Sequence, residues 1–293
     1  MTTTADAASE HSERGILAQI AISIARDRVS LFFVIVLVAI ALVAILADRI
    51  APFDPIAQSL LSINLPPSPE HWLGTDQFGR DILSRIIYGA RTSLLLGTIA
   101  PALAAIIGTA LGVTAGYFGG WIDRVIGRFL DIFLAFPALL LGILIAAALG
   151  AGFWNMVVVL TVAFAPRFAR IARASTLSIR SEAFIEAAIA SGVRTPAIML
   201  NHILPNIAGS IVVVLTLWVA TAIRLEATLS FLGLGTQAPK ASWGVIIRDG
   251  LGNLFGSPWP IVAAGLSITV TVLAFNMLGD KVRDVLDPEA RDE

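Results

Sequence analysis

Residues 29–47 read VSLFFVIVLVAIALVAILA, an apolar run without Asp, Glu, Lys or Arg. A helix rises about 1.5 Å per residue and the hydrocarbon core of a bilayer is about 30 Å thick, so a run of this length can span it. The run is longer than the apolar core of a cleaved signal peptide, and a long polar segment precedes it. It therefore favours an uncleaved anchor over a signal peptide and places the chain among membrane proteins.

The composition of the 293 residues agrees with this assignment. Hydrophobic residues make up 57% and charged residues 14%, against about 45–50% and about 25% in soluble domains. Such a chain has more apolar surface than a soluble fold can bury, so the lipid bilayer has to cover part of it. The net charge of -1 provides no broad positive field, so nucleic acid is not expected as a partner.

Several classes of active site lack the residues that they require. The chain has no cysteine, and its three histidines lie far apart, so neither thiolate chemistry nor a metal centre is expected. Lys240 and Lys281 both lie outside the glycine-rich Gly-Lys-Ser/Thr context that cradles phosphates. We expect no catalytic residue and no cofactor here, so any ATP hydrolysis must occur on another polypeptide.

Charge-poor stretches predict an all-α membrane protein with six transmembrane helices. Gly150-Ala151-Gly152 divides one overlong stretch into a hairpin of two helices, because glycine permits a tight turn. An even number of spans puts both termini on the same side, and arginine and lysine are roughly twice as frequent in the segments on that side, which predicts that it is cytoplasmic. The predicted spans are residues 29–47, 92–122, 132–149, 154–170, 206–223 and 259–278.

These spans divide the chain into four parts. Residues 1–28 are expected to form a cytoplasmic N-terminal segment, partly disordered, and residues 281–293 a cytoplasmic tail. Residues 29–91 hold the first span and an outer loop with an amphipathic helix. Residues 92–280 form the core transmembrane domain, which includes the long inner loop 171–205. Trp72, Trp154, Trp243 and Trp259 fall near the predicted outer boundaries, as interfacial aromatic residues do.

Two outer loops contain more than connecting sequence. In loop 49–91, prolines begin an extended segment, and apolar residues from Ile82 to Ile87 then recur at helical spacing. This predicts a short amphipathic helix at the outer interface, either a cover for the bundle or part of a docking surface for an external partner. In loop 226–258, alternating glycines and apolar residues predict packing against the bundle, as filler or with a role in gating.

Inner loop 171–205 has the capping residues of two short helices. Ser181 can cap a first helix, which Gly192 ends as its C′ glycine. Thr195 can cap a second helix, with Pro196 at the first helical position. The loop therefore predicts a cytoplasmic helical hairpin, either simply solvated or used for docking.

The same loop carries a spaced motif: Glu186-Ala187-Ala188, then Gly192, then His202-Ile203-Leu204-Pro205. This pattern resembles the signature of binding-protein-dependent permeases of the ATP-binding-cassette (ABC) superfamily, in which Glu-Ala-Ala, Gly and Ile-x-Leu-Pro follow at these offsets. Only His202 departs, because it stands where the family has isoleucine.

Other segments are similar to the C-type permeases of dipeptide, oligopeptide and nickel importers, and the similarity extends over about residues 28–288. The segments that carry it are residues 71–76, 79–81, 84–85, 229–235, 242–244 and 276–288. The resemblance implies a type I importer domain in the bacterial inner membrane, with peptide as cargo or, alternatively, nickel or another small solute.

The resemblance also implies partners and a coupling site. A second, homologous permease would complete the translocation path, two ATPase subunits would bind ATP and Mg²⁺, and a substrate-binding protein would deliver cargo from outside. The hairpin would be the coupling helix between permease and ATPase. Its implied coupling residues are Glu186, Ala187, Ala188, Gly192, Leu204 and Pro205.

The translocation path itself is poorly marked in the sequence. Arg224, Glu226 and Asn276 are candidate polar groups of the path. The alternatives are interface anchoring for Arg224 and Glu226 and helix–helix contact for Asn276. A secondary transporter or channel would usually show an ionisable residue inside a span, and a membrane enzyme would show an acid or histidine cluster at a span end. Neither feature is evident in the predicted spans, so the sequence disfavours both alternatives.

Overall fold

The computed structural model describes residues 22–237 and 239–286. In this part of the chain the regular structure is helical, apart from an isolated β-bridge between Thr75 and Asp81. Most of the predicted N-terminal segment and the end of the predicted C-terminal tail lie outside the described residues. The all-α prediction is confirmed.

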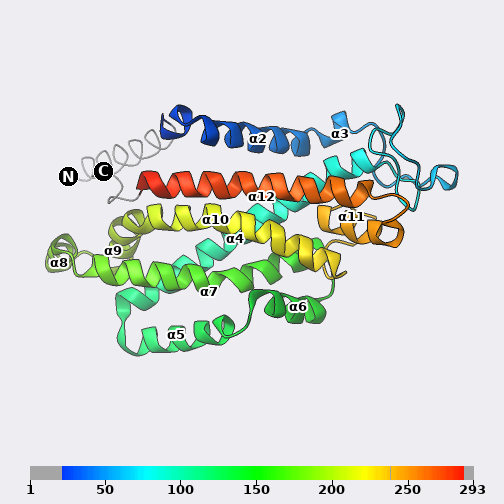
Figure 1. Cartoon of the computed structure of the whole chain (residues 1–293). Helices are drawn as coiled ribbons and strands as arrows, with labels where there is room; N and C mark the ends of the chain where they lie inside the picture. The colour runs from blue at the N-terminus through cyan, green and yellow to red at the C-terminus, as the bar shows by residue number, and fades with distance from the viewer. Residues whose placement is uncertain (1–21, 238, 287–293) are drawn as a thin grey trace.

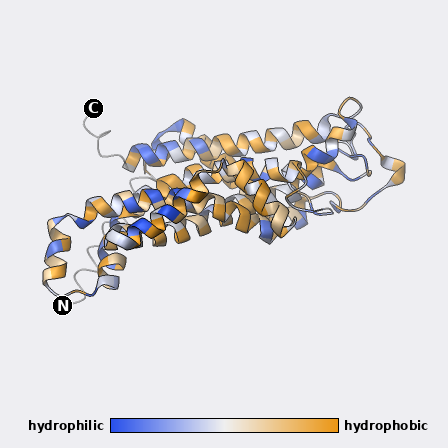
Figure 2. Ribbon diagram, turned by 90° about the horizontal axis from the view of Figure 1, so that it is seen from below, coloured by the Kyte–Doolittle hydropathy of each residue, from blue (hydrophilic) through white to orange (hydrophobic). Residues whose placement is uncertain are grey.

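Five long helices run side by side and form the body of the molecule (Figure 1). Each is long and apolar enough to cross a membrane, and the bent pair α5–α6 supplies a sixth crossing if it counts as one span. Hydrophobic residues predominate along these helices (Figure 2). The five are α2 (Arg28–Ile45), α4 (Ile82–Phe118), α7 (Phe153–Arg180), α10 (Leu204–Phe231) and α12 (Trp259–Leu286).

The predicted straight span over 132–149 is wrong. The chain forms α5 (Gly120–Leu134) and α6 (Ala138–Leu149), whose axes meet at 90°. Pro137 lies between them with an extended backbone, at φ -55° and ψ 134°. Proline has no N–H to donate and forces the preceding residue away from helical geometry, so the helix breaks here. The predicted glycine turn is present, and α7 begins at Phe153 directly after it.

The predicted interfacial helix in the first outer loop is also wrong. Its residues are the first turns of α4, which continues from Ile82 to Phe118. Asp81 caps this helix by accepting a hydrogen bond from the Ser84 backbone N–H, and Arg85 is buried rather than at a lipid surface. Apolar spacing predicted the helix correctly, but it could not show that the helix joins the next span.

Close contact between α4 and α7 forms the centre of the bundle. Gly108, Gly112 and Gly116 repeat every fourth residue and place one face of α4 directly on the α7 backbone. A Cβ atom at Gly108 or Gly112 would collide with a backbone oxygen of α7. Small residues spaced in this way are a common device for packing membrane helices.

The bundle has two distinct ends (Figure 1). We call one the hairpin end; it holds α8 (Ala183–Ala190), α9 (Thr195–Ile198) and η2 (Met199–Ile203). The other, the loop end, holds residues 51–81, α3 (Ala47–Ile50), η1 (Leu60–Ser62), α11 (Trp243–Gly250) and η3 (Leu251–Asn253). Trp243 was predicted at the interface but is 2% exposed, and its indole N–H donates to the Ile86 carbonyl at 3.1 Å.

Candidate functional site

Both helices of the α8–α9 hairpin begin one residue away from the predicted start: α8 begins one residue later and α9 one residue earlier. Ser181 ends α7, and its hydroxyl donates to the Ser178 carbonyl at 2.8 Å instead of capping α8. Glu182 occupies the N-cap of α8, and Arg194 the N-cap of α9, so Thr195 is already helical. The predicted hairpin is present, but the two predicted caps are wrong.

The turn of the hairpin depends on Gly192. Its φ is +74°, and two backbone hydrogen bonds close the end of α8: Gly192 N–H donates to Ile189 O at 3.0 Å, and Val193 N–H to Ala188 O at 3.1 Å. This is a Schellman motif with glycine at C′, as predicted. A Cβ at Gly192 would meet no atom within 4 Å, so the constraint on this residue is its backbone conformation alone.

Buried isoleucines fix the hairpin to the bundle. Ile185 of α8 and Ile198 of α9 are 0% and 1% exposed and belong to the main hydrophobic core. The outward face of the hairpin is apolar and open, since Phe184, Ile189 and Val193 are exposed. The hairpin is therefore rigidly attached on one side and accessible on the other.

Most of the predicted coupling residues are exposed. Ala188 is half-buried, and the exposed residues are Glu186, Ala187, Gly192, Leu204 and Pro205.

A π-helical turn joins the hairpin to the long helix α10. Over Met199–Ile203 the helix widens, and Leu204 N–H bonds to Met199 O. Pro205 follows directly; it cannot donate to the carbonyl of Asn201 and would clash with it in a regular helix. The wider turn removes this conflict, and such bulges often occur at functional sites. The Leu204-Pro205 pair thus marks the place where the hairpin enters the bundle, which the sequence motif alone did not reveal.

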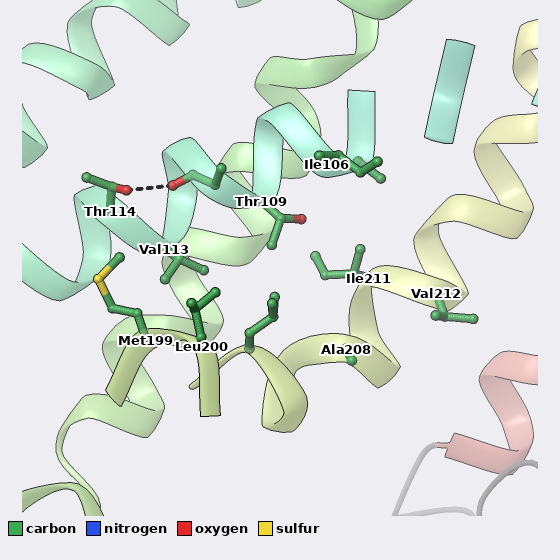
Figure 3. Close-up of a pocket in the computed structure, with 12 residues that line it drawn as sticks. Ile106, Thr109, Val113, Thr114, Met199, Leu200, Ala208, Ile211 and Val212 are labelled. Carbon is green, nitrogen blue, oxygen red and sulfur yellow. Dashed lines mark hydrogen bonds between the residues drawn. The ribbon is translucent and has the colours of Figure 1, made fainter. Parts of the chain in front are cut away.

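An apolar groove of about 460 Å³ lies between α4 and α10, next to this π turn (Figure 3). Its lining residues carry no formal charge, and within the described part of the chain the Thr109 hydroxyl, which lines it, has no hydrogen-bond partner. The labelled lining residues are Ile106, Thr109, Val113, Thr114, Met199, Leu200, Ala208, Ile211 and Val212.

The three candidate path residues have different surroundings. Glu226 is fully buried and accepts hydrogen bonds from Ser93 of α4 at 3.2 Å and from Ser230 at 2.7 Å. Interface anchoring is therefore wrong for Glu226, which joins α10 to α4. Arg224 is exposed, with a guanidinium nitrogen 3.3 Å from the Thr221 hydroxyl, and Asn276 of α12 is half-buried.

Replacement of Glu226 by leucine is expected to lower the free energy of unfolding by about 1–3 kcal/mol, because the buried hydroxyls of Ser93 and Ser230 lose their acceptor. Glu226→Gln keeps an acceptor of the same shape and is the matched control, with a smaller loss. Thermal unfolding of the purified chain in detergent measures both. Equal melting temperatures for the leucine and glutamine variants would show that the hydrogen bonds between Glu226 and the two serines contribute nothing to stability.

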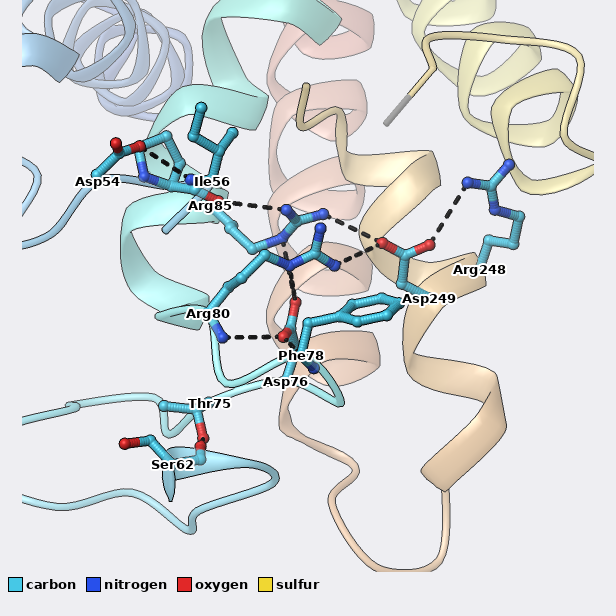
Figure 4. Close-up of polar contacts among 11 residues, drawn as sticks. Asp54, Ile56, Ser62, Thr75, Asp76, Phe78, Arg80, Arg85, Arg248 and Asp249 are labelled. Atoms are coloured by element: carbon cyan, nitrogen blue, oxygen red, sulfur yellow. Dashed lines mark hydrogen bonds and ion pairs between the residues drawn. The ribbon is translucent and has the colours of Figure 1, made fainter. Parts of the chain in front are cut away.

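A buried ion cluster holds the loop end together (Figure 4). Arg80 Nε lies 2.7 Å from Asp76 and its Nη2 lies 2.9 Å from Asp249 of α11. Arg85 lies 3.2 Å from Asp249 and 3.5 Å from Asp76. The four side chains are at most 13% exposed. Two buried cations between two anions balance each other, so the cluster fixes residues 51–81 against α4 and α11.

Two further polar contacts support the same end. His71 Nδ1 lies 2.9 Å from Asp81, the residue that caps α4. Asp48, beyond the end of α2, accepts hydrogen bonds from Arg91 at 2.9 Å and from Tyr88 at 2.9 Å, and these donors lower the pKa of its carboxyl. The predicted first outer loop is thus an ordered part of the bundle at its loop end.

Comparison with known proteins connects these features to a family. The family model described as binding-protein-dependent transport system inner membrane component matches residues 108–292, and the N-terminal transmembrane domain of oligopeptide transport permease C matches residues 17–67. The dipeptide transport system permease protein DppC of Alkalihalophilus pseudofirmus is 48% identical over 77% of this chain and 74% of its own length. The glutathione transport system permease protein GsiD of Escherichia coli is 42% identical over 88% and 85%.

A solved structure shows the same fold. An inward-facing MetNI methionine ABC transporter matches 70% of this chain and 97% of its own chain with a TM-score of 0.57, at 21% sequence identity. The chain belongs to the family of binding-protein-dependent transport system inner membrane components, the permease subunits of ABC importers.

Proposed function

We propose that this chain is the C-type permease subunit of a peptide importer and that its hairpin end is the docking site for an ATPase. The observation that carries the proposal is the α8–α9 hairpin, which is anchored in the core by Ile185 and Ile198 and exposes an apolar face. A second permease completes the path, and ATP and Mg²⁺ bind to the ATPase subunits. A substrate-binding protein delivers cargo at the loop end.

The attachment of the hairpin supports a role in coupling. It connects α7 directly to the continuous helix formed by α9, η2 and α10, so a displacement of α8 has to move both long helices. Phe184, Ile189 and Val193 suit a hydrophobic groove on a partner, and Glu186 adds one exposed charge. ATP then shifts an equilibrium between inward-open and outward-open states by its differential affinity for them.

The distribution of charge supports the proposed orientation. With the hairpin end in the cytoplasm, both termini are cytoplasmic and the arginine-rich segments lie inside, as the positive-inside rule predicts. Peptide is the proposed cargo because relatives of this chain are named for dipeptide and glutathione transport. Nickel or another small solute is the second candidate. The buried ion cluster at the loop end does not distinguish between the two kinds of cargo, because its charged groups pair with one another.

Replacement of Gly192 by valine is expected to reduce ATP-driven peptide uptake by about tenfold or more. Valine at φ +74° costs about 1–3 kcal/mol, because this backbone conformation is strained for a β-branched residue. The turn then opens and the ATPase loses its rigid contact. Uptake of a labelled dipeptide and ATPase activity are measured with the assembled complex in proteoliposomes.

Gly192→Asn is the matched control, because asparagine tolerates a left-handed conformation better than other non-glycine residues do. It is expected to retain most of the uptake. Unaltered uptake in the valine variant would refute the coupling role of the turn. Failure of an ATPase and a second permease to co-purify with the unmodified chain would refute the proposed function itself.

A further inference from the structure

Helix α5 has two different faces along its length. One face carries an exposed apolar stripe at spacings of four, four and three residues: Trp121, Val125, Phe129 and Ile132 are 72%, 46%, 54% and 61% exposed. The other face carries charge and is turned toward α7. Helix α5 lies at the edge of the bundle (Figure 1), where it contacts α4 and α7. The exposed stripe is of the kind that meets lipid chains.

A polar cavity of about 420 Å³ lies between α5 and α7, toward the hairpin end. Asp123 accepts a hydrogen bond from Arg173 at 2.6 Å, and Asp131 accepts one from Arg170 at 3.1 Å. These contacts use both acidic groups of the cavity. The lining residues are Asp123, Arg124, Gly127, Arg128, Leu130, Asp131, Arg170 and Arg173.

The charges of this lining do not balance. Four arginines against two aspartates leave an excess of two positive charges. Within residues 22–237 and 239–286, Arg124 and Arg128 have no ion pair with an acidic side chain, and both are exposed. A cavity of this charge attracts an anion, and arginine is well suited to bind phosphate oxygens with its fork of N–H donors.

The position of the two arginines identifies the kind of anion. At about 100° per residue, Arg124 and Arg128 fall between the apolar stripe and the side of α5 that faces the cavity. A ligand that contacts them therefore has its charge in the cavity mouth and the rest of its body along exposed Trp121, Val125 and Phe129. A soluble anion would gain nothing from that stripe, whereas an acyl chain would cover it.

We propose that Arg124 and Arg128 bind the phosphodiester headgroup of an anionic phospholipid, whose acyl chains lie along the apolar stripe of α5. Basic pockets between membrane helices hold such headgroups through charge and hydrogen bonds. The orientation proposed above places this site in the cytoplasmic leaflet, and only that placement rests on the proposed function. Bound lipid would stabilise the contact between α5 and α7 on the cytoplasmic side of the 90° bend between α5 and α6.

The test uses the full-length chain together with the subunits that co-purify with it. Native mass spectrometry measures the binding of phosphatidylglycerol and of phosphatidylethanolamine in separate titrations. Phosphatidylglycerol is expected to bind about 30-fold more tightly, and the double variant Arg124→Gln/Arg128→Gln is expected to remove this preference. Arg124→Lys/Arg128→Lys keeps the charge and should retain most of it, which controls for misfolding.

A matched variant, Arg28→Gln/Arg283→Gln, removes two exposed charges from the same end of the bundle and should leave the preference within about threefold. An equal loss in this variant would attribute the effect to the general field of the hairpin end and would overturn the proposal. Equal affinity for both lipids would overturn it too, as would displacement of bound lipid by millimolar inorganic phosphate or a dipeptide. None of these results bears on co-purification or uptake, which test the proposed function separately.

Discussion

Gly112→Ala is expected to destabilise the bundle by about 2–4 kcal/mol, which is more than a glycine-to-alanine substitution normally costs in a membrane helix. The new Cβ would collide with the Ala169 carbonyl and would lie 2.8 Å from the Cβ of Ala172 and 2.9 Å from the Arg173 nitrogen. Two of these atoms belong to the α7 backbone and cannot turn aside, so α4 and α7 have to separate. Lost contact between close-packed helices is costly in lipid, where van der Waals packing replaces the hydrophobic effect.

The matched control is Gly265→Ala on α12, where a Cβ would meet no atom within 4 Å. The same substitution there should stabilise the helix by about 0.5–1 kcal/mol, because alanine is the better helix former. Thermal unfolding of both purified variants, together with the fraction that elutes as a monodisperse peak, measures the difference. Two variants of equal stability would contradict the close approach of α4 and α7.

The sequence contains signals for two features of the helices, the close contact between α4 and α7 and the break between α5 and α6. Glycines four residues apart at 108, 112 and 116 indicate a packing face, and Pro137 within a predicted span indicates a break. The predicted spans rest on charge-free length. This criterion finds apolar stretches well but cannot distinguish one straight helix from two that meet at 90°.

The hairpin was predicted more fully than its surroundings. Gly192 specified the turn correctly, because a left-handed residue after a short helix is a local property of the chain. The predicted cap at Ser181 is wrong, because α7 continues to Arg180 and this serine is its C-cap. Local capping signals do not fix a helix end to within one residue, so they could not assign this serine to α7 rather than to α8.

The polar contacts inside the bundle could not be predicted from one sequence. Arg80 and Asp249 are 169 residues apart, and Ser93 and Glu226 are 133 residues apart. Each of these residues looks like an ordinary loop or interface residue in its local context. Their burial becomes evident only when α4, α10 and α11 pack together. A buried charge is stabilised by a partner that is close in space, and that partner can lie far away along the chain.

Asp249→Ala is expected to lower the free energy of unfolding by about 3–5 kcal/mol. The variant leaves Arg80 and Arg85, which are 3% and 2% exposed, to share the one remaining carboxylate of Asp76. An excess positive charge is then buried, and residues 51–81 lose their fixed contact with α11. The measurement is the melting temperature together with the rate of proteolytic cleavage in 51–81, which should rise.

Charge balance, rather than the mere loss of a contact, is the cause of this effect, and two comparisons test it. Asp48→Ala removes an exposed partner of Arg91 and should change the melting temperature little, because solvent screens exposed ion pairs. Arg85→Met combined with Asp249→Leu removes one cation and one anion and leaves Arg80 paired with Asp76, 2.7 Å away. This double variant should be more stable than Asp249→Ala, since apolar side chains can replace a buried ion pair at little cost. A double variant less stable than the single one would show that hydrogen-bond geometry, and not net charge, holds the loop end in place.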